Sequence, residues 1–285
     1  INDLPPLRSV LETNNLSPTK ALGQNFLLDL NLTARIARSA EPLDGCHVIE
    51  VGPGPGGLTR ALLQTDAQTL LVIEKDTRTA PIMDQLAQTD EGQAKAFRVA
   101  FEDALALDLL AEVSAPRAII ANLPYNVATP LLVGWLRDLW REAGAYRSLS
   151  LMIQREVVDR IVAQPGDKAY GRLAVLTSLT VASAERQFDV PAQAFTPPPK
   201  VTSAIVRLDA RTDVPGPLTL FSQIERVTAA AFGQRRKMLR QSLKSLVPQT
   251  EAFLEKLEIP PTARAEERAP HDFRKIAEAL SSALD

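Results

Sequence analysis

One stretch decides the fold: Val48-Ile49-Glu50-Val51-Gly52-Pro53-Gly54-Pro55-Gly56-Gly57-Leu58-Thr59. Its apolar beginning is typical of a buried strand, and the residues after the glycines begin a helix. Glycine has no Cβ, so a ligand can approach the backbone closely, and the start of a helix offers unpaired N–H groups. Gly52, Gly54 and Gly57 satisfy the pattern G-x-G-x-x-G. The stretch therefore predicts a strand, a ligand-binding loop and a helix, as in dinucleotide-binding folds.

Strands and helices alternate after this loop. The patterns predict strands at 46–51, 69–74, 95–101, 117–121 and 148–153, and helices at 58–64, 78–88, 130–140 and 156–163. Strands separated by helix-length segments indicate βαβ units, so we expect an α/β fold with a Rossmann-like, doubly wound, mostly parallel sheet. Two further strands, at 187–190 and 201–208, flank a proline-rich segment and would form an antiparallel edge.

The two ends of the chain differ from this central part. Helices are predicted at 7–14 and 32–40, with an irregular segment at 15–29 between them. A break rich in Thr, Asp, Pro and Gly falls at 211–217, and only helical patterns follow it, at 218–232, 235–246, 250–257 and 271–283. We therefore expect a catalytic domain over 1–210, with an N-terminal helical segment at 1–45, and a small all-α domain over 211–285.

The composition limits the possible classes. The chain has 285 residues, of which 45% are hydrophobic and 23% charged, so a disordered, collagen-like or coiled-coil protein is excluded. Cys46 is the single cysteine, and the only histidines are His47 and His271. No intrachain disulfide and no Cys- or His-rich metal site can form, so we predict no metal and a reducing, cytoplasmic compartment. No apolar stretch reaches 18 residues, so we expect no membrane span.

Acidic residues follow two of the predicted strands. Glu74 lies 22 residues after Gly52, a spacing that suits a carboxylate accepting hydrogen bonds from a ribose diol. This spacing does not separate NAD from S-adenosylmethionine, because both contain an adenosine ribose. Asp103 follows the next strand and is placed to accept from an adenine amino group.

The tetrapeptide Asn122-Leu123-Pro124-Tyr125 closes the fourth strand. An amino-group methyltransferase needs such a group, because the lone pair of adenine N6 is delocalised into the ring. The Asn122 side-chain oxygen and the Leu123 carbonyl can accept the two N–H bonds and aim the lone pair at a methyl group. Pro124 would stiffen the turn and Tyr125 would stack on the base. An Asn-x-Pro turn also ends strands by chance.

A basic cluster lies in the predicted helical domain. The net charge of the chain is −2, but residues 215–250 contain six basic residues and one acid, Glu225. On a helix at 235–246, Arg236 and Arg240 would lie one turn apart, with Lys244 a turn further. We expect Arg235, Arg236, Lys237, Arg240 and Lys244 to contact RNA phosphates without reading sequence. A solvated helix face is the alternative.

Together these motifs resemble the ribosomal RNA adenine dimethyltransferases, which are class I S-adenosylmethionine-dependent methyltransferases, and most closely the bacterial small-subunit type. The resemblance covers almost the whole chain. Its marks are Leu22–Leu27, Glu50–Gly57, Asn122–Tyr125, Gln154–Val157, Phe195–Val201 and Phe232–Leu243.

The resemblance implies S-adenosylmethionine as methyl donor and assigns further site residues. Asn25 and Leu27 would line the cofactor pocket near its carboxylate and methionine end. Gly52 and Gly54 would lie against the cofactor, Glu74 would hold the ribose and Asp103 the adenine amino group. Gln24 and Lys75 would also bind the cofactor. Asn122 would sit between cofactor and target base, and Phe195 would give a second stacking face.

The implied substrate is a pair of adjacent adenosines in the 3′-terminal hairpin loop of 16S rRNA, within the small ribosomal subunit or its precursor. Each adenosine receives two methyl groups on N6, with a role in small-subunit biogenesis. Three alternatives stay open: an NAD-dependent oxidoreductase, a large-subunit (resistance-type) methyltransferase, and a non-catalytic ribosome-assembly factor. We expect a monomer with no membrane partner.

Overall fold

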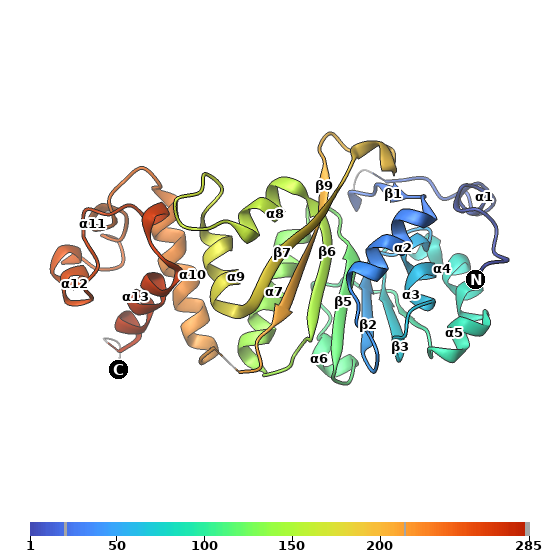
Figure 1. The fold of residues 1–285 in the computed structure, drawn as a ribbon, viewed down its shortest axis with the longest axis horizontal. Helices are drawn as coiled ribbons and strands as arrows, with labels where there is room; N and C mark the ends of the chain where they lie inside the picture. Colours follow the sequence, from blue (N-terminus) through green and yellow to red (C-terminus); the bar gives the residue numbers. More distant parts are fainter. Residues whose placement is uncertain (20–21, 214, 283–285) are drawn as a thin grey trace. The chain divides into compact units, whose positions relative to one another are not determined.

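The computed structural model describes residues 1–19, 22–213 and 215–282. A seven-stranded sheet forms its centre. In spatial order its strands are β4 (Arg98–Ala100), β3 (Thr69–Ile73), β2 (His47–Val51), β5 (Arg117–Asn122), β6 (Ser148–Gln154), β9 (Ser203–Ala210) and β7 (Val181–Val190). Figure 1 shows β3, β2, β5 and β6 side by side in this order. The strands from β4 to β6 are parallel and β9 runs antiparallel to β6, so the predicted sheet with an antiparallel edge is confirmed.

The strand order changes direction at β2. The chain passes from β2 to β3 and β4 on one side, and β5 then lies on the other side of β2. Ligands bind at such a switch point, beyond the carboxyl ends of the strands. The strands there are buried on both faces, and Val48, Ile49 and Val72 have no exposed surface.

Helices connect the strands and cover the sheet. They are α1 (Leu7–Thr13), α2 (Leu30–Ser39), α3 (Gly57–Leu63), α4 (Ala80–Ala87), α5 (Asp90–Ala94), α6 (Leu109–Glu112), α7 (Ala128–Arg141) and α8 (Arg155–Val162), with the short 3-10 helices η2 (Thr77–Thr79) and η3 (Ala192–Ala194). Helix α2 starts at Asp29, whose carboxylate accepts from the backbone N–H groups of Asn31 and Leu32 at 2.8 and 3.2 Å. It packs on α3 through Ile36 and Ala37.

The N-terminal segment is more ordered than the irregular segment predicted at 15–29. Within it, β1 (Phe26–Leu27) pairs antiparallel with β8 (Phe195–Thr196), and Leu27 lies opposite Phe195. Two residues give too short a pattern for periodicity to detect. This pair joins a segment before the glycine loop to one that lies more than 160 residues later in the chain.

The chain divides into two compact units. The first contains 1–134, 144–158 and 185–210, and the second contains 135–143, 159–184 and 211–285. One border between the units falls after residue 210, and the helical unit also contains two segments that lie within the predicted catalytic domain. One of them contains α9 (Arg172–Thr180), whose polar and apolar residues show no helical period in the sequence.

The helical unit also contains α10 (Leu218–Gly233), α11 (Leu239–Ser242), α12 (Thr250–Lys256), η4 (Ala265–Glu267) and α13 (Pro270–Ser282). Aromatic rings form its core: Phe232 packs on both Tyr170 and Phe273, at centroid distances of 5.8 and 5.3 Å. The Tyr170 hydroxyl donates to the carbonyl of Arg268 at 2.8 Å. The predicted helix at 235–246 is wrong, because only Leu239–Ser242 is helical there.

Two glycines give a matched test of the packing. A Cβ on Gly57, at the start of α3, would lie 2.9 Å from the carbonyl oxygen of Leu27 and 3.0 Å from Leu7 Cδ1, whereas a Cβ on Gly134 in α7 would meet nothing within 4 Å. We expect Gly57→Ala to lower the free energy of unfolding by about 1–3 kcal/mol, because the backbone of Leu27 must move. Gly134→Ala should raise it by up to about 1 kcal/mol through helix propensity.

Chemical unfolding followed by circular dichroism measures both changes. Equal effects of the two substitutions would show that the contact between Leu27 and Gly57 does not constrain the fold.

Candidate functional site

A pocket in the sheet-containing unit lies at the carboxyl ends of β2, β3 and β5. It has an empty volume of about 1270 Å³, which includes space open to solvent. Every residue predicted to bind the cofactor or to take part in catalysis lines it: Gln24, Asn25, Leu27, Gly52, Gly54, Glu74, Lys75, Asp103, Asn122, Leu123, Pro124, Tyr125 and Phe195. The structure thus brings together residues that are up to 171 positions apart, and their individual roles stay predictions.

The glycine loop forms one wall of the pocket. Gly54 has a φ of +54°, and a Cβ built on it would lie 3.1 and 3.2 Å from Cδ1 and Cε1 of Phe26. Any side chain here would be strained and would fill the space beside the Phe26 ring. The loop therefore presents bare backbone to the pocket. The contribution of Phe26 was not predicted, because nothing in the sequence shows which ring will meet the loop.

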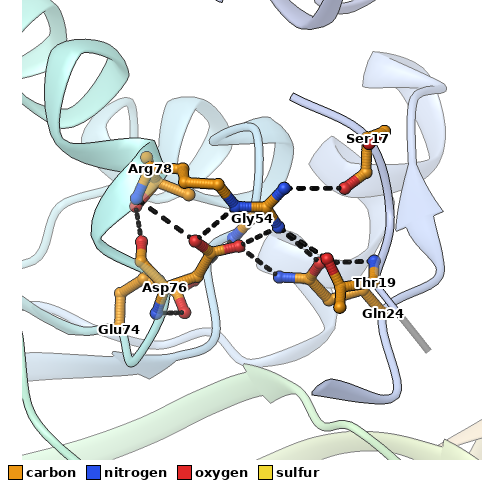
Figure 2. Close-up of polar contacts among 8 residues, drawn as sticks. Ser17, Thr19, Gln24, Gly54, Glu74, Asp76 and Arg78 are labelled. Atoms are coloured by element: carbon orange, nitrogen blue, oxygen red, sulfur yellow. Dashed lines mark hydrogen bonds and ion pairs between the residues drawn. The ribbon is translucent and has the colours of Figure 1, made fainter. Parts of the chain in front are cut away.

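Glu74 is a buried acid held by the backbone (Figure 2). The N–H of Gly54 donates to its Oε2 at 3.3 Å, and the N–H of Asp76 donates to its Oε1 at 2.8 Å. Burial raises the pKa of Glu74, and these two backbone hydrogen bonds oppose the rise. Each oxygen keeps a lone pair, so the carboxyl can also accept from the hydroxyls of a ligand.

Glu50 is a second buried acid at the pocket, and sequence analysis gave it no role. Its residue surface is 1% exposed, and its Oε2 has no hydrogen-bond partner among the described residues. Burial raises the pKa of Glu50 to about 8; the nearby Thr59 side chain opposes the rise, and the negative charge of Glu74 adds to it. A buried, unpartnered oxygen beside the glycine loop is suited to receive a donor from a ligand.

Lys75 and Asp103 lie together at the rim. Lys75 Nζ donates to Asp103 Oδ2 at 2.8 Å, and the N–H of Leu105 donates to Asp103 Oδ1 at 3.0 Å. The Lys75 ammonium is the main reason that the pKa of Asp103 is lowered. Both side chains are exposed, so this is a charged acceptor site open to a ligand at the edge of the pocket.

Asn122 is the last residue of β5, and β5 pairs with β6 so that Asn122 lies opposite Met152. The N–H of Leu123 donates to the Met152 carbonyl at 3.1 Å, and the N–H of Val127 donates to the Pro124 carbonyl at 3.2 Å, which fixes the turn. Neither the Asn122 amide nor the Leu123 carbonyl has a hydrogen-bond partner in the described parts of the chain. Two acceptors are therefore available on a rigid turn.

Tyr125 is anchored at its hydroxyl, which forms a 2.7 Å hydrogen bond with Ser203 Oγ. Ser203 is the first residue of β9 and has no exposed surface. Phe195, 3% exposed, lines the same pocket from β8. The sequence predicted both aromatic residues but not Ser203, because no motif marks a serine that is 78 positions from its partner.

The basic cluster of the helical unit differs from the prediction. Arg235 forms an ion pair with Glu266 at 2.6 Å, and Arg240 forms one with Glu251 at 2.7 Å. Both acids lie outside the segment 215–250 that was considered in the sequence. Since α11 begins at Leu239, Arg236 and Arg240 do not share a helix face, and the predicted stripe is wrong. Arg236, Lys237 and Lys244 are exposed and have no ion-pair partner among the described side chains.

Within residues 1–19, 22–213 and 215–282, no helix is long and apolar enough to cross a membrane. In the same residues, no three or more His, Cys, Asp or Glu side chains are grouped so that they could hold a metal ion.

The buried state of Glu50 predicts a pH-dependent stability. A carboxyl whose folded-state pKa is raised stabilises the fold below the ordinary pKa of about 4.5, and this stability is lost as the pH rises through about 8. Glu50→Gln keeps the shape and stays neutral. We therefore expect the unfolding free energy of the variant, relative to the unchanged protein, to rise between pH 5 and 8 by on the order of a few kcal/mol.

Thermal unfolding of both proteins in the same buffers measures this difference. Glu74 is present in both, so its own titration largely cancels. A gap that stays constant from pH 5 to 9 would mean that Glu50 is ionised in the folded protein.

Comparisons with known proteins add an independent line of evidence. The family model described as ribosomal RNA adenine dimethylase matches residues 15–282. A protein of Ruegeria sp. (strain TM1040) is 52% identical over 281 residues, covering 98% of each chain, and one of Agrobacterium fabrum (strain C58) is 52% identical over 283 residues, covering 98% of this chain and 99% of the relative. Both bear the name ribosomal RNA small subunit methyltransferase A.

Two solved structures share the fold. A dimethyladenosine transferase from Plasmodium falciparum matches with a TM-score of 0.71 and 23% identity, covering 87% of this chain and 94% of that one. The 23S rRNA methyltransferase ErmE matches with a TM-score of 0.64 and 28% identity, covering 90% and 100%. Because the family match includes the glycine loop, the Asn122 turn and the helical C-terminal part, this chain belongs to the ribosomal RNA adenine dimethylase family.

Proposed function

We propose that this chain transfers methyl groups from S-adenosylmethionine to N6 of two adjacent adenosines in the 3′-terminal hairpin loop of 16S rRNA, during biogenesis of the small subunit. The observation that carries the proposal is one pocket in which the Asn122–Tyr125 turn faces the glycine loop and Glu74. The names of relatives that are 52% identical over nearly the whole chain favour the small-subunit substrate. The solved structure that is named a 23S rRNA methyltransferase, a large-subunit enzyme, is only 28% identical.

The pocket fits the cofactor on three observations. Gly54 leaves a cradle that a Cβ would fill, Glu74 keeps free lone pairs, and Glu50 has an unpartnered oxygen. In the proposal, Glu74 accepts from the ribose hydroxyls, while the Lys75–Asp103 pair receives the adenine amino group. Gln24, Asn25 and Leu27 line the methionine end, with Gly52 and Gly54 against the backbone of the loop. When bound, the sulfonium supplies an electrophilic methyl group.

The turn at Asn122 orients the target base. The Asn122 side-chain oxygen and the Leu123 carbonyl accept the two N–H bonds of adenine N6, which withdraws its lone pair from the ring and directs it into the pocket. Tyr125 and Phe195 hold the ring of an adenosine that has left its stack, and aromatic contact offsets the cost of unstacking. Since alignment is the main requirement, a strong general base is not needed at this position.

The helical unit supplies a separate contact to RNA in this proposal. Arg236, Lys237 and Lys244 are free to bind phosphates, whereas Arg235 and Arg240 are engaged by Glu266 and Glu251 and act mainly in shaping the surface. The proposed substrate is a cytoplasmic RNA, which agrees with the single, buried Cys46. The expectation of a monomer stays a prediction.

Methyl transfer from labelled S-adenosylmethionine to unmethylated small subunits, with large subunits in parallel, tests the proposal. Nucleoside analysis should find N6-dimethyladenosine in the small subunit alone. Label in the large subunit would favour the resistance-type alternative. Cofactor binding without transfer to either would favour an assembly factor, and failure to bind the cofactor would contradict the assignment of the pocket.

Asn122→Ala should lower kcat by about 100-fold or more, because one of the two acceptors for N6 is lost, while the Kd of S-adenosylhomocysteine changes little. Asn122→Asp keeps an acceptor oxygen at the same place and should retain more turnover than the alanine variant. Single-turnover methylation of small subunits measures the rates. Turnover at the unchanged rate in Asn122→Ala would exclude the proposed role.

Replacing Arg236, Lys237 and Lys244 together with Ala should weaken RNA binding and reduce the slope of log K against log salt concentration by about 2, as expected for three lost phosphate contacts. The paired variant Arg235→Ala/Arg240→Ala is the control, and should change the slope less because these charges are already neutralised by acids. An equal slope for the triple variant and the unchanged protein would locate the RNA surface elsewhere.

A further inference from the structure

Arg78 joins the turn after β3 to the N-terminal segment (Figure 2). Its Nε and Nη2 donate to Asp76 Oδ1 and Oδ2 at 2.9 and 2.6 Å. The same guanidinium donates from Nη2 to Thr19 Oγ1 at 2.8 Å and from Nη1 to the Ser17 carbonyl at 3.3 Å. One side chain thus bridges two segments that are about 60 positions apart in the chain.

Gln24 completes this set of contacts, which we call the Arg78 network (Ser17, Thr19, Gln24, Asp76 and Arg78). Gln24 Nε2 donates to Asp76 Oδ2 at 2.9 Å, and its Oε1 accepts from the N–H of Thr19 at 2.9 Å. Both ends of the amide are therefore fixed. The backbone at Gln24 and Asn25, which lines the pocket, is held by contacts that lie outside the pocket.

Asp76 links the network to the acid of the pocket. Its own N–H donates to Glu74 Oε1 at 2.8 Å, so the turn that positions Glu74 also carries the carboxylate that binds Gln24. Asp76 is 6% exposed, and the hydrogen bonds from Arg78 are the main reason that its pKa is lowered. Because the Asp76 carboxylate is buried and accepts several hydrogen bonds, its position relative to Gln24 and Arg78 is fixed.

We propose that Asp76 and Arg78 are positioning residues for the cofactor, which hold the Gln24–Asn25 wall at a fixed distance from Glu74. This inference rests on the proposed function of the pocket. Neither residue lines the pocket, so both act through Gln24 and Glu74. The network holds the wall without a bound cofactor, so binding does not have to order it.

The experiment compares two arginines with similar local contacts. Arg211 Nε and Nη2 donate to the two carboxylate oxygens of Asp213 at 3.1 Å each. As in the pair of Arg78 and Asp76, the arginine and the aspartate are two positions apart in the sequence. Among the described residues, however, Arg211 bridges to no other segment. Arg78→Met should raise the Kd of S-adenosylhomocysteine, measured by calorimetry on the full chain, about tenfold. Arg211→Met should leave it unchanged.

Kinetics separates positioning from a general loss of structure. For Arg78→Met, the KM for S-adenosylmethionine should rise by a similar factor, with kcat at saturation and the KM for small subunits within about twofold. Asp76 is buried and loses its main donors in this variant, so Tm should also fall, and binding and kinetics are compared at a temperature at which both proteins are folded. Arg78→Lys keeps the positive charge but not the two parallel N–H donors of the guanidinium, so this variant should still bind S-adenosylhomocysteine more weakly than the unchanged protein. Full recovery by lysine would overturn the proposal, because charge alone would then suffice.

Thr19→Val gives an independent test by removing one acceptor of the network with little change in shape. It should weaken S-adenosylhomocysteine binding about threefold, and the double variant with Arg78→Met should bind no more weakly than Arg78→Met alone, since both cut the same link. Unchanged affinity in Arg78→Met would overturn the positioning role while leaving the proposed function intact. If the unchanged protein itself fails to bind S-adenosylhomocysteine, both proposals fail.

Discussion

The close contact between the Leu27 carbonyl and Gly57 is the constraint on which the rest of the pocket depends. A Cβ at residue 57 would lie 2.9 Å from that oxygen, and one at Gly54 would lie 3.1 Å from the Phe26 ring. The N-terminal segment can therefore lie directly on the loop that connects β2 to α3. Because it does, Leu22–Leu27 becomes a wall of the pocket, and the Arg78 network and the β1–β8 pair have a fixed segment to hold.

This arrangement buries two acids beside the pocket. Glu50 and Glu74 are 1% and 7% exposed, and the charge of Glu74 makes Glu50 harder to ionise. Glu74 gains backbone donors in compensation, whereas Glu50 Oε2 has no partner in the described chain. The side of the pocket proposed for the base is built differently. There the acceptors are the neutral groups of Asn122 and Leu123 at the end of β5, which pairing with β6 holds in place.

Sequence reasoning gave the sheet, its antiparallel edge and the set of pocket residues, because alternating strands and motifs at their carboxyl ends are local patterns. It missed α9, whose polar and apolar residues follow no helical period, and it predicted a helix at 235–246, where only Leu239–Ser242 is helical. It also missed Ser203, Asp76 and the acids that pair with Arg235 and Arg240. Each of these is a contact between distant positions, and no local pattern records its partner.

The β1–β8 pair has a consequence for how the length of the chain can vary. A shift of one position in a ladder puts different residues opposite one another. Leu27 lies opposite Phe195, and both line the pocket. A single inserted residue within either short strand would break this pairing, whereas insertions at 197–202, outside any ladder, would leave the register unchanged. Length variation among related chains is therefore tolerable in the proline-rich segment but not in the two residues that precede it.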